Sequence, residues 1–122
     1  MVDTARPPQD GSSTDANGLL GVLATLAPGR VTTPGPGFDP GALVAFDPGV
    51  VTPAVVVRPR DAAEVAQILP LAAEAWLPVA VRAGGHSYSR RSLVHGGVVL
   101  DLGGLGTVHI DADTRTGRAG AA

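Results

Sequence analysis

The sequence of 122 residues contains no cysteine and no lysine, and its aromatic side chains are limited to two Phe, one Trp and one Tyr. Without cysteine, this chain forms no disulfide bond and no thiolate metal site. Because aromatic residues are so few, the core has to be built from Val, Leu, Ile and Ala. That composition favours a sheet packed by a helix over an aromatic-rich recognition surface.

Clustered positive charge is also missing. All nine basic residues are arginine, eleven acidic residues bring the net charge to −2, and no basic run occurs. Affinity for nucleic acid comes mainly from clustered positive charge, so we expect no nucleic-acid partner. No window approaches the roughly 18 uncharged apolar residues of a membrane span. Residues 1–18 hold no apolar stretch typical of a secretory signal, and we expect a cytoplasmic protein without a membrane partner.

Proline and glycine divide the chain into three segments. Residues 1–18 are predicted to be a disordered tail, because their Pro, Gly, Ser and Asp content cannot offset the entropy of ordering. Residues 19–51 are predicted to form an irregular lead-in with short helical turns over 19–27 and 42–46. Three apolar residues of this lead-in are expected to pack against a sheet, namely Phe38, Leu43 and Phe46. The packed domain is expected over 52–122, and a chain of this length holds one domain at most.

The packed segment opens with a strand and a helix. The β-branched run over 54–58 predicts a buried strand. Asp61 and Glu64 form a capping-box pattern, and apolar residues then follow at helical spacing, which predicts a helix over 62–75. Pro70 lies inside that helix, where proline removes one backbone bond at a cost of about 3 kcal/mol. We therefore expect a kink or an early end there.

Further strands complete the predicted fold. A second strand over 77–82 makes a parallel βαβ unit with the first strand and the helix. A third strand is predicted over 97–102, and residues 108–111 and 116–119 read as a hairpin. The expected fold class is α+β, with an irregular N-terminal tail.

The second strand breaks at two glycines and then presents a histidine. Successive backbone N–H groups in a Gly84-Gly85 turn form a nest for a phosphate oxygen, and Ser87 adds a hydroxyl donor. His86 at the edge of that nest is suited to act as a general base, a metal ligand or a covalent tether. The simpler alternative is a plain turn with a loop histidine. The residues alone do not choose between these roles.

Other chemistries find less support. The three histidines lie nine and fourteen residues apart without a carboxylate at ligand spacing, which makes a metal site the weakest interpretation. A Gly-x-Ser-x-Gly elbow is absent, as are a Walker loop and a Gly-x-Gly-x-x-Gly fingerprint. We therefore propose neither a serine hydrolase nor a P-loop or Rossmann nucleotide site.

The order of residues from Pro53 to Gly120 resembles a known family. The matching runs are Pro-Ala-Val-Val-Val-Arg-Pro-Arg-Asp-Ala-Ala-Glu-Val at 53–65, Leu-Pro-Val-Ala-Val-Arg at 77–82, Gly-Gly-His-Ser-Tyr at 84–88 and Gly-Gly-Val-Val-Leu-Asp-Leu at 96–102. They resemble the FAD-linked oxidoreductases of the para-cresol methylhydroxylase (PCMH) and vanillyl-alcohol oxidase type, most closely the berberine-bridge-enzyme-like branch. The resemblance implies a partial FAD-binding PCMH-type lobe over 52–122, truncated at its C-terminal side.

The resemblance also implies roles for single residues. His86 would be bonded covalently to the 8α-methyl carbon of the flavin, adding as the neutral imidazole. Tyr88 would flank the loop or pack over the turn, whereas Arg58 and Asp61 are assigned to capping and Asp101 to structure. The residues that would line the pyrophosphate and ribityl region of FAD, mostly through main-chain N–H groups, are Arg82, Ala83, Gly84, Gly85, His86 and Ser87.

Several features depart from the family pattern. Trp76 replaces a small residue before Leu-Pro, Ala83 stands where a third glycine is common, and Arg90-Arg91 occupies a loop that is usually small and polar. The 122 residues contain no later glycine-rich flavin loop, no cysteine for a second flavin bond and no substrate domain.

The expected function is the amino-terminal part of an FAD-dependent oxidoreductase, with a covalent flavin tether but without a substrate site. Such a chain is not expected to be active in isolation, and a small-molecule substrate requires the missing C-terminal part. The alternative is a non-catalytic truncated remnant or interaction module that does not bind FAD alone. A third possibility is a subunit that recruits its missing half from another polypeptide.

Overall fold

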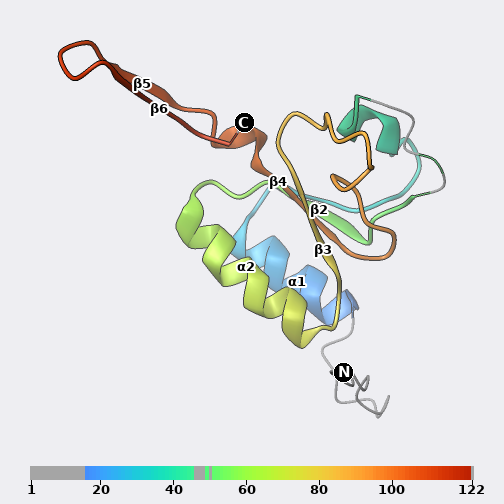
Figure 1. Cartoon of the computed structure of the whole chain (residues 1–122). Coiled ribbons are helices and arrows are strands. Elements are labelled where there is room, and N and C mark those ends of the chain that lie inside the picture. Colours follow the sequence, from blue (N-terminus) through green and yellow to red (C-terminus); the bar gives the residue numbers. More distant parts are fainter. Residues whose placement is uncertain (1–15, 46–48, 50, 122) are drawn as a thin grey trace, which may run out of the picture.

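The computed structural model describes residues 16–45, 49 and 51–121, which form a four-stranded sheet, two α-helices and a separate hairpin (Figure 1). The helices and strands are α1 (Ala16–Leu26), β1 (Val31–Thr32), β2 (Val55–Val57), α2 (Ala62–Glu74), β3 (Val79–Arg82), β4 (Val98–Asp101), β5 (Val108–Asp111) and β6 (Thr116–Ala119), with two 3₁₀ turns, η1 (Pro40–Leu43) and η2 (Leu102–Gly104). The predicted α+β class is confirmed.

The sheet has the strand order β1-β2-β4-β3. Strands β2, β4 and β3 are parallel, so the predicted βαβ unit is present with the third predicted strand inserted between its two strands. The short strand β1 pairs antiparallel with β2 at one edge. In the register of β3 and β4, Arg82 lies opposite Asp101, and both residues end their strands. The carboxyl ends of these parallel strands therefore meet at one edge of the sheet.

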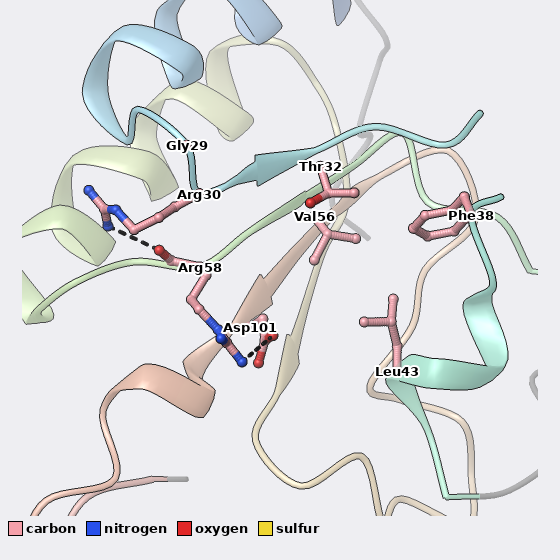
Figure 2. A pocket seen from close by; sticks show the side chains of 8 residues that line it. All are labelled: Gly29, Arg30, Thr32, Phe38, Leu43, Val56, Arg58 and Asp101. Atoms are coloured by element: carbon pink, nitrogen blue, oxygen red, sulfur yellow. Dashed lines mark hydrogen bonds and ion pairs between the residues drawn. The ribbon is translucent and has the colours of Figure 1, made fainter. Parts of the chain in front are cut away.

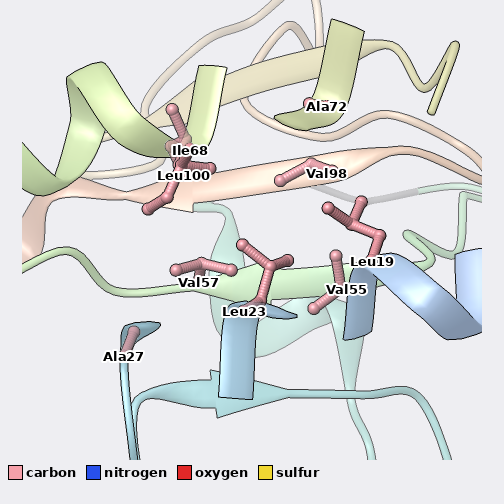
Figure 3. Packing of buried hydrophobic residues seen from close by; sticks show 9 residues of the cluster. All are labelled: Leu19, Leu23, Ala27, Val55, Val57, Ile68, Ala72, Val98 and Leu100. Carbon is pink, nitrogen blue, oxygen red and sulfur yellow. The ribbon is translucent and has the colours of Figure 1, made fainter. Parts of the chain in front are cut away.

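Both helices cover the same face of the sheet, and the apolar residues between them form the main core (Figure 3). In α1, Leu19 and Leu23 are one helical turn apart and fully buried, and in α2 the same holds for Ile68 and Ala72. This i, i+4 spacing places each pair on a single helix face. The sheet contributes the buried side chains of Val55, Val57, Val98 and Leu100.

Helix α2 begins and continues for identifiable reasons. The Asp61 carboxylate accepts a hydrogen bond from the Glu64 N–H at 2.8 Å, which confirms the predicted N-cap. Of the two outcomes predicted at Pro70, a kink or an early end, the early end is wrong, because the helix continues to Glu74. Pro70 lies on the exposed side, and the next turn places Ala72 in the core. Burial of that turn outweighs the lost backbone bond.

The end of α2 carries an unusual residue. The N–H of Leu77 donates to the carbonyl of Ala72, and the N–H of Trp76 donates to that of Ala73, both at 3.0 Å. These two bonds define a Schellman motif, whose left-handed position usually holds glycine. Here Trp76 occupies it with φ of 55°. The departure from a small residue at this position therefore places a side chain in strained backbone geometry.

Within the described ranges, irregular segments and no α-helix cover the opposite face of the sheet. Val56, Ala80 and Val99 form its buried floor together with Leu93 from the loop before β4. Phe38 and Leu43 pack against this floor, as predicted, whereas Phe46 lies outside the described residues. The irregular lead-in therefore acts as the second layer on this face.

The boundaries within the first fifty residues differ from the prediction. Helix α1 begins at Ala16, so residues 16–18 are helical and do not belong to a tail, and residues 1–15 lie outside the described part. Strand β1 was not predicted, and the second helical turn covers Pro40–Leu43 instead of 42–46. Two residues of strand carry no sequence pattern of their own, because β1 is defined by its pairing with β2.

The hairpin of β5 and β6 has the predicted boundaries and extends away from the sheet (Figure 1). Its apolar side chains Val108 and Ile110 are 70% and 74% exposed. None of the helices in the described ranges is long and apolar enough to cross a membrane.

Candidate functional site: the glycine loop after β3

The loop over 83–88 leaves the carboxyl end of β3 and turns at two glycines. Gly85 has φ of +71°, a conformation that side chains disfavour. A Cβ at Gly84 would lie only 2.5 Å from Nδ1 of His86, so the imidazole folds back over that residue. The backbone geometry therefore requires glycine at Gly85, whereas a Cβ at Gly84 would only displace the exposed imidazole of His86.

A second segment lies directly against this loop. A Cβ at Gly85 would collide with the carbonyl oxygen of Leu43 and with Cα of Val44. The N–H of Ala45 donates to the carbonyl of Gly85 at 2.9 Å. The backbone that follows η1 and the glycine loop are therefore in contact along their main chains.

The loop has backbone donors available for a ligand. Its carbonyls at Gly85 and Ser87 accept internal hydrogen bonds, from Ala45 and Arg90. Across the described part of the chain, the N–H groups of Gly84, Gly85 and His86 donate to no protein acceptor. Successive free N–H groups in a turn of this kind suit a phosphate oxygen. The donor set thus fits the pyrophosphate of a dinucleotide cofactor.

The remaining loop side chains differ in their surroundings. His86 is exposed, and Tyr88 is 85% exposed. The Ser87 hydroxyl accepts from the N–H of Arg91 at 3.3 Å and lies 3.2 Å from the Ser89 hydroxyl. Ser87 therefore closes the turn locally, while His86 stands open to solvent beside the free N–H groups.

Arg82 differs from the loop residues that follow it, because its side chain is committed to the protein. Its Nη1 donates to Oδ1 of Asp101 at 2.7 Å, and its Nε donates to the carbonyl of Leu43 at 2.5 Å. Asp101 also accepts from the N–H of Gly103 at 3.0 Å, which confirms its structural role. Opposite charges at the ends of two parallel strands are a sequence signal that would have identified this pair.

A second arginine–carboxylate pair stabilises the other face of the sheet. Arg30 binds Glu64 through both terminal nitrogens, and the N–H of Arg60 donates to the same carboxylate at 2.7 Å. Hydrogen bonds from Arg30 lower the pKa of Glu64 to about 2, and the Glu64 carboxylate in turn raises the pKa of Arg30. Sequence reasoning assigned Glu64 to capping alone and missed Arg30, because no local pattern links two residues so far apart in the chain.

A cavity of about 310 Å³ lies at the carboxyl ends of β2 and β4 (Figure 2). Its guanidinium groups belong to Arg30, paired with Glu64, and to Arg58, 3.4 Å from Asp101. None of the predicted loop residues 83–88 lines it. The lining residues are Gly29, Arg30, Thr32, Phe38, Leu43, Val56, Arg58 and Asp101.

Comparison with known proteins identifies the family. The family model described as "FAD binding domain" matches residues 53–122. The chain belongs to this FAD-binding domain family. It is 36% identical to the FAD-dependent monooxygenase FUP4 of Fusarium proliferatum over 89 residues, or 71% of the chain. It is 32% identical over 84 residues, or 69% of the chain, to (R)-6-hydroxynicotine oxidase of Paenarthrobacter nicotinovorans.

A solved structure agrees with this assignment. Wild-type BBE-like 1 of Physcomitrella patens superimposes with a TM-score of 0.70 over 81% of the chain at 26% identity. The matched regions span 17% and 18% of the two curated relatives and 22% of the solved chain. The resemblance to PCMH-type FAD-binding domains is thereby confirmed, and FAD is the cofactor of the domain.

Proposed function

We propose that this chain forms the lobe of an FAD-dependent oxidoreductase that holds the flavin through residues 82–88 and bonds it covalently at His86. The observation that carries the proposal is the loop itself: three free backbone N–H groups lie beside an exposed imidazole. Family membership supplies the cofactor, and the loop supplies donors suited to its pyrophosphate.

The residues of the loop have different proposed roles. The N–H groups of Gly84, Gly85 and His86 bind the pyrophosphate, and the missing Cβ atoms allow its close approach. The bound cofactor supplies hydride acceptance, which the protein tunes by position. His86 would supply the imidazole nitrogen that tethers the 8α-methyl carbon of the flavin.

Catalysis requires more than these residues. The chain spans less than a fifth of the two curated relatives named above, one called a monooxygenase and the other an oxidase. We propose oxidation of a small organic molecule as the reaction class, with the substrate site in the part of such proteins that lies outside the matched region. In that arrangement residues 82–88 anchor the cofactor and do not touch the substrate.

One observation favours a second candidate function. The β5–β6 hairpin exposes apolar side chains and unpaired strand edges, as expected of an interaction module that does not hold FAD alone. This alternative predicts a folded chain without cofactor.

Acid precipitation after expression with ample FAD tests the proposal. The absorbance of the precipitated protein at flavin wavelengths is compared for the wild type, His86→Ala and His109→Ala. His109 lies on the exposed hairpin and serves as the matched histidine control. We expect bound flavin in the wild type and in His109→Ala, and complete loss of covalent flavin in His86→Ala. A colourless wild type contradicts the proposal and favours the interaction module.

A further inference from the structure

We propose that residues 43–45, here called the strap, set the conformation of the glycine loop, and that Arg82 and Asp101 are positioning residues that fasten the strap. The expected change in flavin retention rests on the proposed function. The expected change in the order of the glycine loop does not, because it can be measured on the protein without cofactor.

The strap fixes the direction of a backbone donor. Its Ala45 N–H donates to the carbonyl of Gly85. In a planar trans peptide the carbonyl of one residue and the N–H of the next point in opposite directions. Holding the Gly85 carbonyl toward the strap therefore turns the His86 N–H away from it, to the side where it meets no protein acceptor. The strap thus presents this donor to a ligand.

Steric contact adds a second restraint. The Leu43 carbonyl oxygen and Cα of Val44 occupy the space that a Cβ of Gly85 would fill. The loop therefore cannot move closer to the strap at Gly85. The steric contact and the hydrogen bond from Ala45 both act on Gly85. The orientation of the peptide between Gly85 and His86 therefore depends on the position of the strap.

Arg82 fastens the strap to the sheet. Its guanidinium joins the Leu43 carbonyl to the Asp101 carboxylate, and the two side chains are only 17% and 10% exposed. Charge-assisted hydrogen bonds of this type are shorter and stronger than neutral ones, and the planar guanidinium fixes both acceptors at once. Arg58 also approaches Asp101, at 3.4 Å, but its side chain is 54% exposed, so solvent screens that pair.

The arrangement offers the flavin a loop that is already ordered. A ligand that has to order a loop spends part of its binding free energy on doing so. Loosening the strap is therefore expected to reduce cofactor retention even though the backbone N–H groups of Gly84, Gly85 and His86 are all still present. Loss of loop order and loss of flavin are separate measurements, and the first needs no FAD.

The test uses ¹⁵N relaxation on the full chain without FAD. Two matched pairs are compared, Arg82→Met with Arg30→Met and Arg82→Lys with Arg30→Lys, since each arginine joins a buried carboxylate. In the wild type the order parameters of Gly84, Gly85 and His86 are expected at the rigid-backbone value of about 0.85. Arg82→Met should lower these order parameters below about 0.6. Arg82→Lys should give an intermediate value, because a single ammonium group does not reproduce the planar guanidinium that binds both acceptors.

The Arg30 variants separate loop positioning from general destabilisation. They should lower the midpoint of thermal unfolding while leaving the loop order parameters at the wild-type value. Unchanged loop order in Arg82→Lys or Arg82→Met overturns the proposal, as does an equal loss of loop order in the Arg30 variants. Where a Met variant does not fold, the Lys pair decides.

Flavin retention provides the second measurement. After growth with FAD, Arg82→Lys is expected to carry several-fold less covalent flavin than Arg30→Lys. A wild type without flavin counts against the proposed function alone, because the relaxation data on the cofactor-free chain still decide the role of the strap.

Discussion

The two faces of the central sheet are covered in different ways. Helices α1 and α2 pack regularly on one face, around side chains such as Leu23 and Ile68 that are fully buried. The other face is covered by irregular backbone, and its smaller cluster includes Leu93 at 6% exposure. Each face also has a largely buried carboxylate bound by an arginine, Glu64 by Arg30 and Asp101 by Arg82.

The comparison separates stability from function. Helices satisfy their own backbone groups and bury large apolar side chains, which makes the helical face the source of most hydrophobic stabilisation. Irregular backbone leaves some N–H groups without protein partners, and such groups are available to bind a ligand. The candidate site therefore lies next to the less regular face, at the carboxyl ends of the parallel strands, where ligands commonly bind in such sheets.

The largest difference between the faces is expected in core truncations. Ile68→Ala on the helical face should lower the free energy of unfolding by about 2–5 kcal/mol, since helices relax little into the cavity. Leu93→Ala on the other face should cost about 2 kcal/mol or less, because irregular backbone can collapse around the gap. Urea denaturation of both variants measures the difference. Equal losses would show that the two faces are equally rigid.

The Arg30–Glu64 pair predicts how stability depends on pH. The pKa of Glu64 is about 2 in the folded chain, below its ordinary value of 4.5. Its contribution is therefore fully present above about pH 4.5 and is lost as the pH falls toward 2. In Glu64→Gln the free energy of unfolding should be lower at pH 7 and should fall less steeply between pH 5 and pH 2.

Glu74→Gln is the matched control for this experiment. Glu74 is an exposed carboxylate at the other end of α2. Denaturant titrations at several pH values should give this variant the wild-type slope. If Glu64→Gln also keeps the wild-type slope, the ion pair with Arg30 does not stabilise the fold in solution.

The smallest expected effect is a gain in stability on the helical face. Trp76 has φ of 55° and is 56% exposed, so its backbone is strained while much of its ring stays in water. Trp76→Gly should be about 1 kcal/mol more stable than Trp76→Ala, because only glycine adopts this conformation without cost. Thermal unfolding of the two variants isolates the backbone contribution. A more stable Ala variant would show that the left-handed conformation does not persist in solution.

Sequence patterns predicted the elements whose signal is local. The β-branched run at 54–58, the Asp61 cap and the hairpin at 108–119 each depend on residues close together in the chain, and each is present. The glycine loop was found by the same reasoning, since Gly84-Gly85 breaks an apolar strand.

Features that depend on distant contacts were not predicted. Strand β1 exists only because Val31 pairs with Val57, and the insertion of β4 between β2 and β3 follows from the packing of the whole sheet. The strap had no sequence signal, because its hydrogen bonds join residues about forty positions apart. The continuation of α2 past Pro70 likewise depends on burial of the next turn against the sheet.

The close approach of Gly85 to Leu43 and Val44 has a consequence for protein engineering. The glycine loop cannot be moved to another scaffold by itself, because its backbone contacts a segment about forty residues earlier in the chain. A graft of residues 82–88 onto another scaffold would need residues 43–45 and a carboxylate equivalent to Asp101 to travel with it. Mutant libraries that randomise the glycine loop should vary residues 43–45 and 82–88 together.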